Sequence, residues 1–151
     1  MRAELLITGA VIAAFCGALI FVVLRVVRAM AEKTIAVLEA TEGVVRRSGR
    51  LTTTIHLTGY SSSHMRSSGM MSRRKAELVL TRRGLVLVTP YAIRLGDAPY
   101  DALSVKMNKA GVLHLQTAQP PDATGTVEVW IKVSAPLEWV DALGIPRDRA
   151  L

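Results

Sequence analysis

Residues 58–75, with the sequence TGYSSSHMRSSGMMSRRK, combine residue types that are well suited to binding an anion. The segment contains serine hydroxyls, glycine amides and four basic side chains, namely Arg66, Arg73, Arg74 and Lys75. Guanidinium and ammonium groups form charge-assisted hydrogen bonds with phosphate, and glycine-containing turns can present backbone amides to anions. The segment is therefore a candidate site for a phosphate or a lipid headgroup. The alternative is a mobile, solvated loop whose charges keep a strand edge from pairing with another chain.

Positive charge is concentrated in one third of the chain. The net charge of +7 divides into zero for residues 1–43, +9 for residues 44–94 and −2 for residues 95–151. Near an anionic membrane leaflet, each surface Lys or Arg contributes about 1 kcal/mol of attraction. The candidate anionic-lipid or partner patch comprises Arg66, Arg73, Arg74, Lys75, Arg82 and Arg83. No nucleic acid is expected as a partner, because the basic segment lacks regularly interleaved aromatic residues for base stacking.

The sequence contains no motif that indicates catalysis. It has no GxSxG, HExxH, Walker A or paired-carboxylate arrangement, and His56, His64 and His114 lack metal-ligand spacing. A length of 151 residues excludes a multidomain enzyme, and the single cysteine, Cys16, excludes a disulfide scaffold. We therefore expect no enzyme activity, catalytic residue, metal or cofactor.

The N-terminal part of the chain, residues 1–24, is predicted to be a membrane anchor. Residues 5–24, LLITGAVIAAFCGALIFVVL, carry no charge, and as a helix they would extend about 30 Å, the thickness of a bilayer core. Their twelve Leu, Ile, Val and Phe residues favour insertion by about 4 to 7 kcal/mol. A cleaved signal peptide has a shorter apolar region with positive charge ahead of it. Here Arg25 and Arg28 follow the apolar run, which favours a helix that spans the bilayer.

The flanking charges predict the orientation of this helix. Arg2 is the only basic side chain before the apolar run, whereas Arg25, Arg28 and Lys33 follow it. The positive-inside rule therefore places the N-terminus outside and the C-terminal domain in the cytoplasm, with the anchor in the inner membrane.

Small residues are spaced four apart within the anchor. Gly9, Ala13 and Gly17 form a stripe that would let another helix approach closely, in a homodimer or a larger membrane complex. Alternatively, the stripe faces lipid and is unused.

Residues 25–43 are predicted to continue the helix as a juxtamembrane stalk. The segment contains no proline, and Gly43 is suited to cap the helix after Glu42. Two heptads are too few for a stable coiled coil by themselves. The stalk is favoured over an extension of a dimer.

From residue 44 onward the apolar period changes from helical to strand-like. Alternation predicts strands at 51–58, 76–80, 103–107, 112–116 and 127–133, with residues 85–88 as an apolar strand after the Arg83-Gly84 turn. Two hairpins are expected, 76–80 with 85–88 and 103–107 with 112–116. A helix at about 136–143 would present Leu137, Val140 and Leu143 to the core, between Pro136 and Gly144. Residues 44–151 thus predict one mainly-β barrel or roll of six or seven strands.

Several segments of this domain resemble bacterial PH-like and GRAM-like domains. They are KAELVLTRRGLVLVTP, Ile93, YDALSVKM and the returning strand VLHLQT, and the resemblance covers roughly residues 50–145. It implies a PH-like split barrel with a binding or scaffolding role, commonly beside membranes. In PH domains that bind phosphoinositides, basic residues around the first strand pair do so, which is consistent with the basic segment here. The long Ser-rich stretch 58–72 departs from the compact first hairpin of that pattern.

Together these features predict a single-pass membrane protein that presents a cytoplasmic PH-like binding or scaffold domain at the membrane surface. The bilayer is the expected partner, and anionic headgroups are a candidate ligand. The alternative is a small accessory subunit of a larger membrane complex, held through its transmembrane helix.

Overall fold

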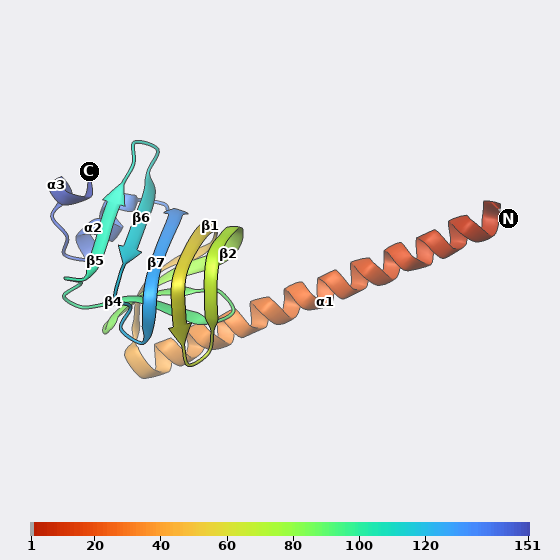
Figure 1. Cartoon of the computed structure of the whole chain (residues 1–151), viewed down its shortest axis with the longest axis horizontal. Coiled ribbons are helices and arrows are strands. Elements are labelled where there is room, and N and C mark those ends of the chain that lie inside the picture. The colour runs from red at the N-terminus through yellow and green to blue at the C-terminus, as the bar shows by residue number, and fades with distance from the viewer. Residues whose placement is uncertain (1) are drawn as a thin grey trace.

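The computed structural model describes residues 2–151, with side chains from Leu6 onward. Met1, part of the predicted anchor, and the side chains of Arg2, Glu4 and Leu5 lie outside the described part. The chain forms a long N-terminal helix, a curled seven-stranded antiparallel sheet and a short C-terminal helix, followed by one further helical turn (Figure 1). The fold class predicted from the sequence is confirmed.

Helix α1 runs from Arg2 to Glu42 without interruption. From Leu6 onward it is long and apolar enough to cross a membrane, and its apolar side chains up to Val26 are exposed. It ends where the sequence predicts, because Gly43 adopts a φ of 70° and donates its amide to the carbonyls of Leu38 and Glu39. Glycine reaches this left-handed conformation without steric cost.

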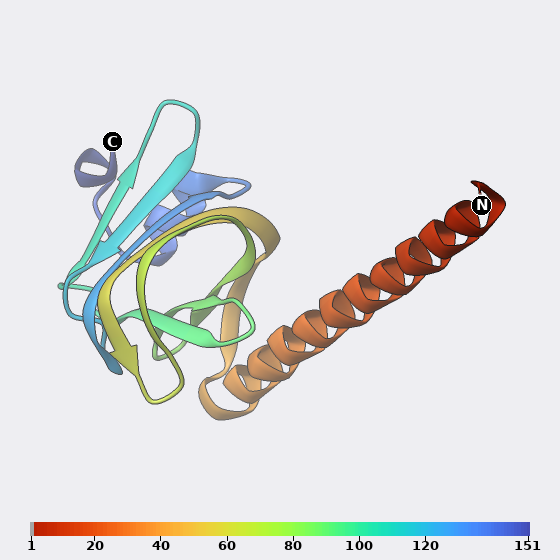
Figure 2. The same ribbon diagram turned by 45° about the vertical axis from the view of Figure 1, so that its right-hand side comes forward.

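The seven strands form one sheet in the order β4-β3-β2-β1-β7-β6-β5, with all neighbours antiparallel. Their bounds are β1 Val44–Ser62, β2 Arg66–Thr81, β3 Gly84–Val88, β4 Ala92–Asp97, β5 Leu103–Met107, β6 Val112–Thr117 and β7 Ala123–Lys132. Both predicted hairpins are confirmed, as β2 with β3 and β5 with β6. The sheet curls into a half-barrel (Figure 2).

The Ser-rich stretch 58–72 is paired strand rather than a long loop. It forms the ends of β1 and β2, with a tight turn between Ser62 and Arg66. The Ser62 amide donates to the Met65 carbonyl, and the Ser62 hydroxyl accepts the Met65 amide at 3.2 Å. These bonds satisfy the turn and make β1 and β2 unusually long, 19 and 16 residues.

The inner face of the half-barrel holds the main core. Its fully buried side chains include Ile55, Leu113 and Val129. Helix α2, Pro136–Ala142, packs against this core through Trp139 and Val140, and a last turn, α3, spans Arg147–Ala150. Val140 and Leu143 are buried as predicted, but Leu137 is only half-buried, and Trp139 contributes the larger buried side chain.

A second apolar cluster joins α1 to the outer face of the sheet. Ala31, Ile35 and Leu38 of α1 are buried against Val79 of β2 and Val86 and Val88 of β3. Strand β3 is therefore covered on both faces, which explains why its sequence is an unbroken apolar run rather than an alternation. The last turns of α1, within the predicted juxtamembrane segment 25–43, are thus packed against the domain.

Candidate functional site

The structure divides the six predicted patch residues into separate groups. Arg73, Arg74 and Lys75 lie in the middle of β2, and Arg66 lies at its start. Arg82 and Arg83 lie in the turn between β2 and β3. Arg74 and Arg82 are eight positions apart, which is about 26 Å along an extended strand. The six residues therefore do not form one continuous patch.

A bulge in β2 explains why three basic side chains are exposed in succession. Thr53 is paired with Arg74 and Ile55 with Met71, so two residues of β2 face the single residue Thr54 on β1. Arg73 has a φ of 55°, and the Thr53 hydroxyl donates to the Arg74 carbonyl at 3.0 Å. Because a bulge interrupts the inward-outward alternation, residues 72–75 are all exposed.

These three side chains line a groove of about 660 Å³ between α1 and one end of the half-barrel. Two further basic residues outside the predicted patch, Arg28 of α1 and Arg50 of β1, also line it. Their signal in the sequence is weak, because only the docking of α1 brings residue 28 beside residues 73–75. The apolar lining comes from Val23, Leu24, Val27, Ile55, Met65, Met71 and Ile93, and the β3–β4 turn contributes residues 89–91.

The positive charge in this groove is not compensated. Among the side chains described, residues 6–151, no carboxylate lies within 4.0 Å of the charged groups of the five lining basic residues. The Lys75 ammonium donates a hydrogen bond to the Thr52 hydroxyl at 3.0 Å. An apolar groove with an unpaired basic rim is suited to a ligand that is both apolar and anionic.

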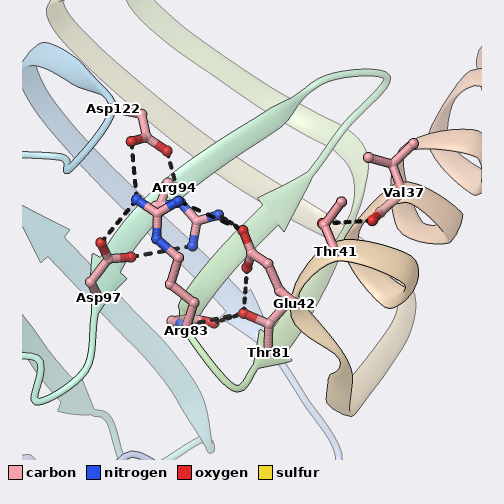
Figure 3. Close-up of polar contacts among 9 residues, drawn as sticks. Val37, Thr41, Glu42, Thr81, Arg83, Arg94, Asp97 and Asp122 are labelled. Atoms are coloured by element: carbon pink, nitrogen blue, oxygen red, sulfur yellow. Dashed lines mark hydrogen bonds and ion pairs between the residues drawn. The ribbon is translucent and has the colours of Figure 1, made fainter.

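The far end of α1 has the opposite character, because its charges are paired (Figure 3). Arg94 of β4, with 8% of its side chain exposed, contacts the carboxylate of Glu42, the last residue of α1. Arg94 also bonds Asp122 at 2.9 Å and Asp97 at 3.2 Å. Glu42 in turn accepts a hydrogen bond from the Thr81 hydroxyl at 2.7 Å. Burial lowers the pKa of Arg94, but its bonds with Glu42 and Asp122 outweigh this and raise it above its ordinary value.

This network fixes the orientation of α1 relative to the sheet. Arg83 adds contacts with Asp97 and Asp122 from the exposed side. About two turns before the end of α1, the Thr34 hydroxyl donates to the Pro90 carbonyl at 3.1 Å, beside the basic groove. The helix is therefore held near its C-terminal end and at the groove, so the groove has a defined shape.

The remaining candidate residues lie elsewhere. His114 and Trp130 stack on the outer face of β6 and β7, with ring centroids 4.7 Å apart and planes within 5°. Next to them, His56 Nδ1 lies 3.7 Å from Glu128. Within the described residues, no group of three or more His, Cys, Asp or Glu side chains is placed to hold a metal ion.

The small-residue stripe lies on the same side of α1 as the docked domain. Gly9, Ala13 and Gly17 precede residues 27, 31 and 35 by eighteen positions each, and eighteen residues complete five helical turns. All three small residues are exposed, and a side chain added at Gly9 or Gly17 would meet no atom within 4 Å. A second helix packed on the stripe would therefore lie on the side of α1 that faces the domain.

The basic groove is the site at which apolar and charged features converge, and it joins residues 23–28 of α1 to residues 50–75 of β1 and β2. The buried network at Glu42 and the packing of Ile35 and Leu38 hold its two walls together. Comparisons of the chain with protein-family models, with curated proteins and with solved structures found no significant match.

Proposed function

We propose that the chain is a single-pass inner-membrane protein that holds a PH-like β domain against the cytoplasmic surface of the bilayer as a binding or scaffold module. The observation that carries this proposal is the continuity of α1. One helix includes both the apolar run and the residues buried against β2 and β3. The domain is then positioned by packing rather than tethered by a flexible linker.

The position of the groove supports placement at the membrane surface. Val23 and Leu24, the last residues of the apolar run, line it, and Arg28 follows about one helical turn later. If the apolar run spans the bilayer, this side of the domain lies at the level of the headgroups. The unpaired basic residues there favour an anionic leaflet, which agrees with the orientation that the positive-inside rule predicts.

The cytoplasmic placement is tested by thiol labelling in intact cells. Cys16 is the only cysteine, so a variant that combines C16S with S104C carries a single thiol on the exposed face of β5. We expect a membrane-impermeant maleimide to label this variant only after the membrane is permeabilised. The C16S variant alone serves as the unlabelled control. Labelling of S104C in intact cells would overturn the proposal.

An accessory role in a larger membrane complex is the second candidate, and the exposed stripe favours it. A helix packed at Gly9, Ala13 and Gly17 would lie on the domain side of α1, where it could also contact the sheet. The variant G9L/G17L should lose co-purification with a larger membrane protein in mild detergent. The matched control is A14L/A18L, which enlarges small residues on another side of the helix. A full chain that runs as a clean monomer would contradict this role.

A further inference from the structure

We propose that the groove between α1 and the half-barrel binds one anionic glycerophospholipid of the surrounding leaflet. The headgroup phosphate lies among Arg28, Arg73 and Arg74, and an acyl chain runs along Val23, Leu24 and Val27 toward Met65 and Met71. This inference rests on the proposed membrane anchoring and names the ligand of the same surface.

The apolar part of the groove is continuous with both the membrane span and the domain core. Val23 and Leu24 belong to the apolar run, and their side chains are exposed. At its inner end the groove reaches Ile55 and Ile93, which are 0% and 1% exposed. An acyl chain in the groove would therefore contact both the apolar run of α1 and the end of the half-barrel.

Methionine side chains suit the inner wall of such a groove. Met65 and Met71 are half-buried and pack against the main core. Their unbranched thioethers adapt to irregular apolar ligands and repack easily. The volume of about 660 Å³ lies within the usual range for small-molecule pockets.

The charge of the rim selects the headgroup. Arginine forks bind phosphate oxygens in pairs, and Arg28, Arg73 and Arg74 approach the groove from α1 and from the β2 bulge. Arg50 and Lys75 add two positive charges. Because no described carboxylate neutralises these five groups, an occupant with a negative headgroup is favoured over a zwitterionic one.

The test uses the full chain in a neutral detergent, with native mass spectrometry as the readout. Equal amounts of dioleoyl phosphatidylglycerol and dioleoyl phosphatidylcholine are added, and the lipids retained by the protein are counted. We expect one phosphatidylglycerol per chain and little phosphatidylcholine. Soluble glycerol phosphate at millimolar concentration should not displace it, since it lacks the acyl chains. Complete displacement by glycerol phosphate would assign the site to a free phosphate ester and overturn the lipid proposal.

Two variants separate a specific site from general charge attraction. R73A/R74A removes two rim charges and should lower phosphatidylglycerol retention on the order of tenfold or more. K106A/K109A removes the same charge from exposed positions on the β5–β6 hairpin and should retain the lipid as the unaltered chain does. An equal effect of both variants, or equal retention of the two lipids, would overturn the proposal.

A third variant tests the apolar wall while keeping every charge. M71W should fill the groove and reduce retention at both low and high salt, with the unfolding temperature of the chain showing that the domain still folds. If M71W folds and retains phosphatidylglycerol fully, the acyl chain does not enter the groove and the proposal fails. If the chain retains phosphatidylglycerol selectively but the S104C thiol is labelled in intact cells, only the cytoplasmic placement is refuted. If the thiol is protected in intact cells but no lipid is retained, only the lipid site is refuted.

Discussion

Arg94, on β4, is bonded to the carboxylate of Glu42, which ends α1 and lies 52 positions earlier in the chain. This contact joins the end of α1 to β4, the edge strand of the sheet next to β3. Both side chains are largely removed from water, and Thr81, Asp97 and Asp122 complete the network. Together with the packing of Ile35 and Leu38 on the sheet, this contact holds the domain in place relative to the helix.

Replacing Arg94 by methionine should destabilise the domain by about 3 kcal/mol, because it removes the nearest cation from the largely buried Glu42 and leaves the half-exposed Arg83, 3.9 Å away, as its described cationic neighbour. Urea unfolding of the full chain in detergent, followed by tryptophan fluorescence, to which Trp130 and the buried Trp139 both contribute, measures this effect. The matched control is R83M, which removes an arginine of the same network that is 50% exposed and should cost less than about 1 kcal/mol. Equal losses in the two variants would show that burial of the Arg94 contact has no special weight.

The docking of α1 on β2 and β3 predicts a difference between adjacent helix residues. Leu38 is buried against the sheet, whereas Val37 is about half exposed. L38A should lower stability by about 2 kcal/mol and increase hydrogen exchange of amides 31–42. V37A should change stability by less than about 0.5 kcal/mol. Matching exchange in both variants would mean that the helix end is not docked in solution.

Tyr60 predicts a dependence of stability on alkaline pH. Burial raises the pKa of Tyr60 above its ordinary value, Asp122 adds to this, and a hydrogen bond with Ser62 opposes it. The folded state therefore favours the neutral phenol, so stability is complete below the unfolded pKa of about 10 and declines as pH rises through the folded pKa.

The variant Y60F should remove part of this alkaline decline. It leaves Tyr100, whose pKa burial also raises, as the remaining contributor of this kind. Unfolding of both proteins at pH 8 and above pH 10, with phenolate absorbance recorded in parallel, measures the effect. An unchanged decline in Y60F would contradict the assignment to Tyr60.

The stacked rings of His114 and Trp130 should be coupled energetically. A double-mutant cycle with H114A and W130A is expected to give a coupling energy of about 1 kcal/mol. Either single substitution already removes the ring stacking, so the second substitution cannot remove it again. A control cycle with K106A and W130A should be additive within about 0.5 kcal/mol, since Lys106 pairs with His114 rather than with Trp130. Additivity in the first cycle would show that the stack contributes nothing measurable to stability.

Local sequence was sufficient for the elements that depend on near neighbours. An uncharged run of twenty residues predicts a long apolar helix, and Gly43 predicts its end. The turns at residues 83–84 and 108–111 predict two hairpins, because turn chemistry and alternating strands act over a few residues. By contrast, the Ser-rich stretch does not predict the extended pairing of β1 with β2, since polar strands at the end of a sheet show little apolar periodicity.

The amino-acid sequence is sufficient to predict a membrane-length apolar helix and a basic β domain with a short terminal helix. Which basic residues lie together depends instead on tertiary packing. Arg28 lines the same groove as Arg73 and Arg74 because α1 packs on the outer face of β2 and β3. The bulge at Arg73 exposes the neighbouring basic side chains. The docking of α1 depends on contacts such as that between Glu42 and Arg94, which lie 52 positions apart, and the bulge depends on the pairing of Thr53 with Arg74. Periodicity and local charge do not encode such contacts.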